Sequence, residues 1–175
     1  PPLELEQFAG VPYQNPYEAV ANAELIVRGK VVSTSFTQDL SQSLPVARII
    51  VRIDETIKGA PSSQLEFDQT GGPVPQEGGG ALVQLRGNPI LLPGDDVLLL
   101  MTREDSGAYW PLNHVGIYFV RTGLLHTTAT NSCASIVEGT PIDTVLTAMR
   151  SSAAAVVNKQ AKCGWNAELT PAVVP

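Results

Sequence analysis

The sequence is poor in the residues from which metal sites, redox centres and nucleic-acid surfaces are built. Its 175 residues include two histidines and two cysteines, and only 16% of all residues are charged. Eleven Lys and Arg stand against 17 Asp and Glu, and the resulting net charge of -6 repels polyphosphates, so a nucleic-acid partner is not expected. No apolar run approaches the roughly 20 residues that a membrane-spanning helix needs, so membrane insertion is not expected either.

The two histidines flank a predicted hairpin. If Thr122-Gly123 is a two-residue turn, Phe119 pairs with His126. His114 then lies about five residues further along the ladder, roughly 17 Å away at ~3.3 Å per residue, and on the opposite face. Zinc binds nitrogen ligands at about 2.1 Å, so the two rings cannot share an ion in this register. Because the motifs GxSxG, HExxH, GxGxxG and the Walker loop are also missing, we predict no catalytic, metal-binding or cofactor-binding residue, and no enzyme.

Cys133 and Cys163 are the two cysteines, and they lack the CxxC spacing of a zinc site. A disulfide between them would close a loop of about 30 residues and stabilise the fold by roughly 3–4 kcal/mol in the chain-entropy model. The alternative is a redox-active or zinc-binding thiol pair. The low charge density also favours an exported protein, extracellular or at the cell surface. Positions 1–30 lack the basic-then-apolar order of a signal peptide, which implies that the signal has been removed.

Alternating apolar residues predict several antiparallel strands. Leu25, Val27 and Val31 fall on one face of the first. Val97–Met101 is apolar on both faces and is expected to be a central strand. The segment Thr70–Gly80, rich in Gly and Pro, predicts a long loop. In the strand predicted over positions 46–59, the residues expected to share one face are Ala47, Ile49, Val51, Ile53 and Ile57.

Two helices are expected to flank the strands. A short one begins at Pro16, after the cap Asn15, and a long one runs from Thr140 to Gly164. The predicted class is mainly β with α: an OB-like antiparallel β-barrel, or a sandwich, with both helices beside it. We divide the chain into an extended N-terminal arm (1–14), a single barrel domain with its C-terminal helix (15–164) and an extended C-terminal tail (165–175).

Several polar and aromatic residues have both a functional and a structural interpretation. Arg28, Lys30, Arg48 and Arg52 form a basic strip if their strands pair, but no aromatic residue interleaves to stack on bases, which favours an exposed strand face. Tyr109 and Trp110 follow a turn and can either display a binding surface or pack on the core.

The segments "YEAVANAELIVRGKVVS", "ARIIVRIDETIKG" and "PGDDVLLLM" resemble the netrin-like module of tissue inhibitors of metalloproteinases, which recurs in exported bacterial proteins. The resemblance covers about residues 15–121, and it implies an OB-like five-stranded barrel. Those inhibitors bind the zinc of the target protease through an N-terminal cysteine. This chain has Pro1 there, so the resemblance implies the scaffold without the inhibitory apparatus.

The leading hypothesis is a non-catalytic exported domain that binds another protein or its own copies. Its apolar ends have little core to join and could add as strands to the open edge of a neighbour. On this view the interaction residues are Gly71, Gly72, Tyr109, Trp110, Val173 and Val174, and removal of Ala167–Pro175 abolishes self-assembly. Two other classes stay open. One is an inhibitor of an extracellular hydrolase that uses the barrel rim or the Gly-rich loop Gly71–Gly80, and the other is an enzyme with an unfamiliar site around His114, Tyr109 and Asp105.

Overall fold

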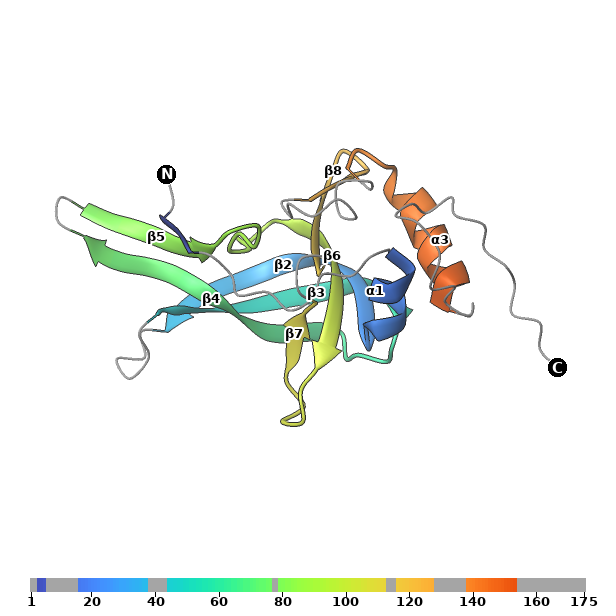
Figure 1. Ribbon diagram of the computed structural model, residues 1–175, viewed down its shortest axis with the longest axis horizontal. Helices are drawn as coiled ribbons and strands as arrows, with labels where there is room; N and C mark the ends of the chain where they lie inside the picture. Colours follow the sequence, from blue (N-terminus) through green and yellow to red (C-terminus); the bar gives the residue numbers. More distant parts are fainter. Residues whose placement is uncertain are drawn as a thin grey trace.

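The computed structural model describes residues 3–5, 16–37, 44–76, 79–112, 116–127 and 138–153. These residues form nine strands and two helices (Figure 1). In chain order the elements are β1 (Leu3–Leu5), α1 (Pro16–Asn22), β2 (Leu25–Thr37), β3 (Val46–Lys58), β4 (Gln64–Gln76), β5 (Gly79–Leu85), β6 (Asp96–Arg103), β7 (Tyr109–Pro111), β8 (Ile117–Arg121), β9 (Leu124–His126) and α3 (Ile142–Ala153).

All the strands belong to one sheet with the order β1-β5-β4-β3-β2-β6-β8-β9, and β7 pairs with β6 off this path. Every pair is antiparallel except β1–β5, which is parallel. The predicted mainly β antiparallel class is therefore confirmed. The sheet is not closed, because no ladder among the described residues joins β1 to β9 or β4 to β7.

Strand β6 lies at the centre of the core, as its sequence predicts. Leu98 and Leu100 point to one side, where helices α1 and α3 cover the sheet. Val97, Leu99 and Met101 point to the other side, toward the apolar side chains of β3 and β4. Since successive side chains of a strand alternate between faces, a strand buried on both faces must be apolar throughout.

The faces predicted for β2 and β3 are correct except at Ile57. Ala47, Ile49 and Val51 are fully buried, and Ile53 packs on the same cluster. Ile57 instead packs on the helix-covered side. The register explains the difference, because the β2–β3 ladder skips Asp54 and then Ile57 itself. An extra residue in one strand shifts the alternation, so a bulge moves later side chains to the other face.

The prediction of a long loop at Thr70–Gly80 is wrong. Strand β4 continues to Gln76 and β5 begins at Gly79, so most of the Gly- and Pro-rich segment is a hairpin. We call its described residues, Gly71–Gln76 and Gly79–Leu85, the arm. Figure 1 shows the arm projecting from the end of the molecule opposite the two helices. Glycine and proline therefore marked an unusual strand here and not a loop.

The helix predictions hold where the structure describes the chain. Helix α1 begins at Pro16, and α3 follows Thr140-Pro141 and buries Ile142, Val145, Leu146 and Met149. The helix is described as far as Ala153, so its predicted extension to Gly164 lies outside the described residues. The turn before α3 is bonded to β9, since Leu125 N–H donates to Thr140 O at 2.9 Å and Gly139 N–H donates to Leu125 O at 2.8 Å.

Candidate interaction surface

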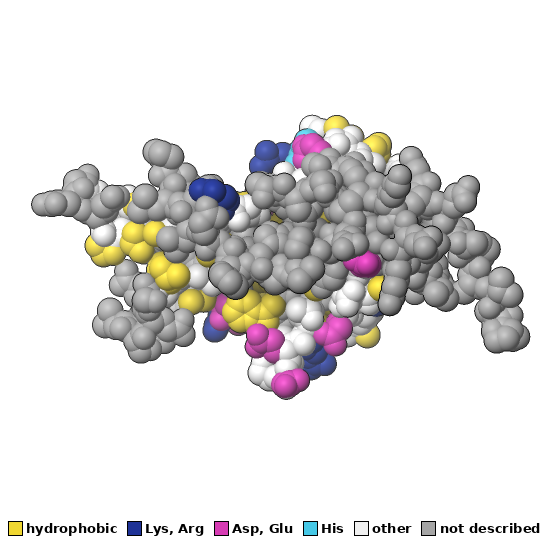
Figure 2. All heavy atoms as spheres, viewed as in Figure 1, with side chains coloured by type: hydrophobic (Ala, Val, Ile, Leu, Met, Phe, Trp, Pro, Cys, Tyr) yellow, Lys and Arg dark blue, Asp and Glu magenta, His cyan; other side chains and the backbone are white. Residues whose placement is uncertain are grey.

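The chain has 28 charged residues, and none of them belongs to the described arm. Glu77, between its two strands in the sequence, lies outside the described residues. The arm differs in this respect from the charged strands beside it. Large exposed apolar side chains are also found on β2 and in the segment before β6. Val32 is 43% exposed, Phe36 is 40% exposed and Leu92 is 52% exposed. Figure 2 shows hydrophobic side chains gathered at this end of the molecule.

The segment that carries Leu92 is held beside β2 by three hydrogen bonds. Thr34 Oγ1 donates to Leu91 O at 2.7 Å, Gly94 N–H donates to Val31 O at 2.9 Å, and Val31 N–H donates to Asp95 O at 2.9 Å. Leu92 therefore lies next to the residues that present Val32. Val32 lies on the same outward face of β2 as Lys30, and the β2–β3 ladder skips it, which places a bulge there. Large apolar side chains left exposed are candidates for a contact surface.

Gly71 and Gly72 connect the arm to the rest of the sheet. Both are buried, with φ angles of 134° and 151° that only glycine adopts readily. A Cβ at Gly71 would lie 2.5 Å from Val83 O, and a Cβ at Gly72 would lie 2.9 Å from Phe36 Cδ1. At this point β4 leaves β3 and pairs with β5. The two glycines, predicted as interaction residues, thus set the conformation of the arm from inside.

Tyr109 lies at an open depression of about 490 Å³ between the β3–β4 connection and the β6–β7 hairpin. Its ring packs on the core cluster of β3 and β4, and the Arg103 guanidinium lies 5.7 Å from the ring centroid. Gln64 and Glu66 of β4 line the opposite side of the depression. Trp110 is 36% exposed and pairs with Thr102. The turn between β6 and β7 contains Asp105, which is exposed.

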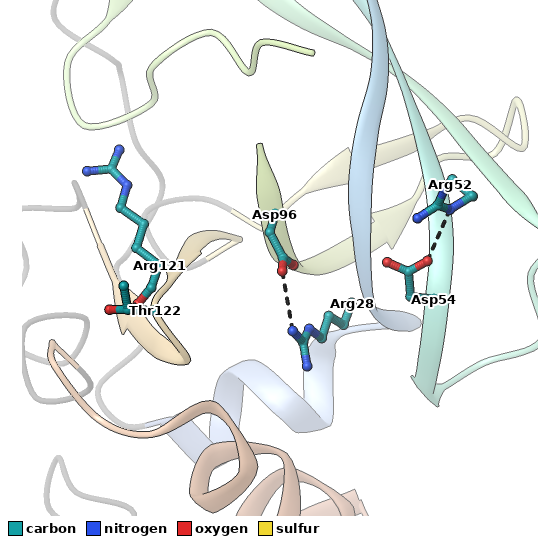
Figure 3. Close-up of polar contacts among 6 residues, drawn as sticks. All are labelled: Arg28, Arg52, Asp54, Asp96, Arg121 and Thr122. Carbon is teal, nitrogen blue, oxygen red and sulfur yellow. Dashed lines mark hydrogen bonds and ion pairs between the residues drawn. The ribbon is translucent and has the colours of Figure 1, made fainter. Parts of the chain in front are cut away.

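The basic strip exists, and its arginines are paired with carboxylates. Lys30 is opposite Arg52 in the β2–β3 ladder. Figure 3 shows Arg28 reaching Asp96 on β6 and Arg52 reaching Asp54 on its own strand, at 3.3 Å and 3.1 Å. Arg48 binds Asp68 at 3.1 Å, and this carboxylate raises the pKa of Arg48. The predicted exposed strand face is therefore correct for Lys30, Arg48 and Arg52, and Arg28 is partly buried.

The predicted register of the last hairpin is confirmed, because Arg121 pairs with Leu124 and Phe119 pairs with His126. Thr122 has a φ of 51° and Gly123 a φ of 76°, as a two-residue type I′ turn requires. In Figure 3 the Arg121 side chain points away from Asp96, so these charges do not form one site. His114 lies outside the described residues.

His126 has a partner that the sequence pattern did not indicate. Its Nδ1 lies 2.6 Å from Glu138 Oε1, and Thr127 N–H donates to Glu138 Oε2 at 2.8 Å. These two hydrogen bonds lower the pKa of Glu138. Glu138 begins the turn that leads into α3, so the pair fastens this turn to β9.

The remaining predicted residues cannot be placed. Cys133, Cys163, Val173 and Val174 lie outside the described residues, so the disulfide and the role of the tail stay predictions. Within the described ranges, no group of three or more His, Cys, Asp or Glu side chains could hold a metal ion. Neither α1 nor α3, the two helices of the described chain, is long and apolar enough to cross a membrane.

The sequence interpretation missed Val32, Phe36 and Leu92. Val32 and Phe36 belong to a strand for which no face was predicted beyond Val31, and Leu92 precedes a turn. The long Gly- and Pro-rich segment was the available signal, but its composition is also that of a loop. Comparison of the chain with protein-family models, curated proteins and solved structures found no match.

Proposed function

We propose that the chain is a non-catalytic exported domain that acts through protein–protein contacts, and that the arm with its neighbouring apolar residues is the contact surface. The observation that carries the proposal is the hairpin whose two strands lack charged residues and which extends away from the helix-covered core (Figure 1). A projecting hairpin whose strands lack charged residues exposes backbone groups and apolar atoms to a partner while adding little to its own core. The partner is a protein, either another chain or a further copy of this one.

Hydroxyl-radical footprinting tests this proposal. The oxidation of Phe36 and Leu92 is compared between the purified chain and the extracellular or cell-surface material that contains it. We expect both residues to be oxidised in the purified chain and protected in that material. Trp110, which is exposed and lies away from the arm, is the internal reference. Equal oxidation of Phe36 and Leu92 in the two samples would refute the assignment of the arm.

Inhibition of an extracellular hydrolase is the second proposal, and the depression beside Tyr109 favours it. An inhibitor of this kind would insert the β6–β7 hairpin or the rim of the depression into the cleft of an enzyme. Incubation of the monomeric chain with a panel of extracellular proteases tests it, with Tyr109→Ala as the matched variant. Protection of Trp110 instead of Phe36 in the footprint would select this surface.

The OB-like assignment is likewise a proposal. The order β4-β3-β2-β6 places a three-stranded meander next to a later strand that returns to its first member, and this order supports a variant of such a barrel. The prediction that removing Ala167–Pro175 abolishes self-assembly also remains a proposal. Light scattering on the shortened chain distinguishes the tail from the arm, since assembly through the arm survives the truncation.

A further inference from the structure

The depression between the β3–β4 connection and the β6–β7 hairpin is bordered by a strand edge. Ile53 N–H donates to Ser63 O at 2.9 Å, so these two residues bond to each other across the β3–β4 ladder. Bonded and non-bonded pairs alternate along an antiparallel ladder, and Gln64 and Glu66 therefore direct their backbone groups away from β3. Both residues line the depression. Among the residues that the structure describes, no strand other than β3 pairs with this part of β4.

This edge offers a limited set of hydrogen-bonding groups. Ser62 Oγ donates to Gln64 O at 2.7 Å, so that carbonyl already has a donor. Gln64 N–H and both backbone groups of Glu66 have no backbone partner in the described part of the chain. A strand antiparallel to β4 would exchange two hydrogen bonds with Glu66 and, two residues later, accept one from Gln64 N–H. An acceptor is needed there without a donor, which suits the carboxylate at the end of a peptide.

Arg103 adds a positive charge to the lining of the same depression. Its Nε–H donates to Gly107 O at 3.2 Å, and its guanidinium lies 5.7 Å from the centroid of the Tyr109 ring. Neither contact uses the N–H groups of the two Nη atoms, which can bind a carboxylate. Within the described ranges Arg103 contacts no carboxylate side chain. The arginines that do are Arg28, Arg48, Arg52 and Arg150.

Acidic side chains near the depression determine which anion fits. Glu66 is paired with Arg48 at 3.3 Å, whereas Glu104 and Asp105 are exposed in the turn between β6 and β7. The two carboxylates of the turn repel a small free anion. A ligand that binds Arg103 must therefore gain further contacts from the strand edge and from the apolar part of the lining. That part consists of Ile50, Ala60, Pro61 and Leu65.

We propose that the depression binds the carboxyl-terminal end of a partner polypeptide in an extended conformation. The terminal carboxylate accepts hydrogen bonds from Gln64 N–H and from the Arg103 guanidinium, and the third residue from the end pairs with Glu66. Apolar side chains of the peptide contact the apolar lining. The volume of about 490 Å³ is that of a site for a small ligand, so a short segment fills it. The depression shares no residue with the arm and can bind a peptide whether or not the arm is a contact surface.

NMR titration of the isotope-labelled chain with two synthetic peptides tests the proposal. The probes are acetyl-Ala-Val-Val with a free carboxylate and the same peptide as its C-terminal amide. We expect the free acid to shift the amide signals of Gln64 and Glu66, and the amide form to bind roughly ten- to a hundredfold more weakly, because a charge-assisted hydrogen bond is lost. Equal affinities of the two peptides would overturn the proposal. So would the absence of any shift at these signals with peptide on the order of 10 mM.

Two arginine variants assign the carboxylate. Arg103→Gln is expected to reduce the affinity for the free acid to that for the amide, and the spectrum of the variant shows whether it is folded. Arg52→Gln is the matched control, because Arg52 is also exposed but is paired with Asp54 at 3.1 Å and does not line the depression. It should bind the acid within about threefold of the parent chain. If Arg103→Gln still prefers the acid, or if both variants lose the preference, the assignment to Arg103 is wrong.

Discussion

The conformation of the arm predicts a graded response to alanine at three of its glycines. Gly71 has a φ of 134° and no room for a Cβ, Gly79 has a φ of 143° but no atom within 4 Å, and Gly80 has neither constraint, with Val74 O at 3.9 Å. Alanine at Gly79 must adopt a backbone conformation that is nearly restricted to glycine, which costs about 1–3 kcal/mol. Alanine at Gly80 restricts only the unfolded chain and is expected to stabilise the protein by roughly 0.4–1 kcal/mol.

Gly71→Ala combines both penalties. Its Cβ would lie 2.5 Å from Val83 O, whereas real Cβ atoms keep about 3.0 Å or more, so the two strands must separate by about 0.5 Å. Val83 is opposite Gly72 in the ladder, so this displacement strains the first hydrogen bonds of the arm. We therefore expect Gly71→Ala to destabilise the arm by roughly 2–6 kcal/mol, the sum of backbone strain and overpacking.

Native-state hydrogen exchange is the appropriate assay, because the arm can open without global unfolding. The amides of Val74, Ala81 and Val83, which bond within the hairpin, report its opening. They are expected to exchange fastest in Gly71→Ala, more slowly in Gly79→Ala and most slowly in Gly80→Ala. Global unfolding in denaturant complements the measurement. If Gly71→Ala protects these amides as well as Gly80→Ala does, the described path of the chain through the arm is wrong.

Three further predictions concern the core and the ion pairs. Leu98→Ala removes a fully buried side chain under the helices and should lower the free energy of unfolding by about 2–5 kcal/mol in urea, whereas Val32→Ala should change it by less than about 0.5 kcal/mol; similar effects would contradict the assigned burial. Arg28→Met removes the cation that pairs with Asp96, whose Oδ1 is buried and accepts no hydrogen bond. We expect the free energy of unfolding to fall by about 1–2 kcal/mol and the double variant Arg28→Met/Asp96→Leu to recover part of this loss. Additive losses would show that the two side chains do not interact. The lowered pKa of Glu138 stabilises the folded state above the ordinary carboxyl pKa of 4.5, and this contribution is lost as the pH falls through the lowered value. Glu138→Gln should therefore be less stable than the parent chain at neutral pH, by no more than ~1 kcal/mol for an exposed pair, and the difference should shrink in acid; a difference that grows in acid would have the wrong sign.

Local sequence patterns were sufficient to predict those structural features that depend on residues close together in the chain. The register of the last hairpin followed from Thr122-Gly123, because a two-residue turn leaves one pairing for Phe119 and His126. The central position of β6 followed from its unbroken apolar run, since only a strand covered on both sides needs one. The start of α1 at Pro16 followed from the fixed φ of proline.

Patterns failed where one residue changes the phase of a whole strand. The bulge at Asp54 moved Ile57 to the other face, and nothing in the alternation of β3 marks that position. The bulge at Val32 likewise changed the face of the residues that follow it in β2, so Phe36 is opposite the buried Ala47. Bulges depend on how two strands fit each other, so a single strand does not reveal them.

The sequence by itself determined that the chain is a β-rich protein with an apolar central strand and flanking helices. Periodicity and turn residues express local conformational preferences that survive in any fold. Only the tertiary structure decided that the segment rich in Gly and Pro is a projecting hairpin of β4 and β5. That outcome depends on the close approach of Val83 and Phe36 to Gly71 and Gly72, which are contacts between residues distant in the chain. The same contacts lie where β4 leaves β3 and begins to pair with β5.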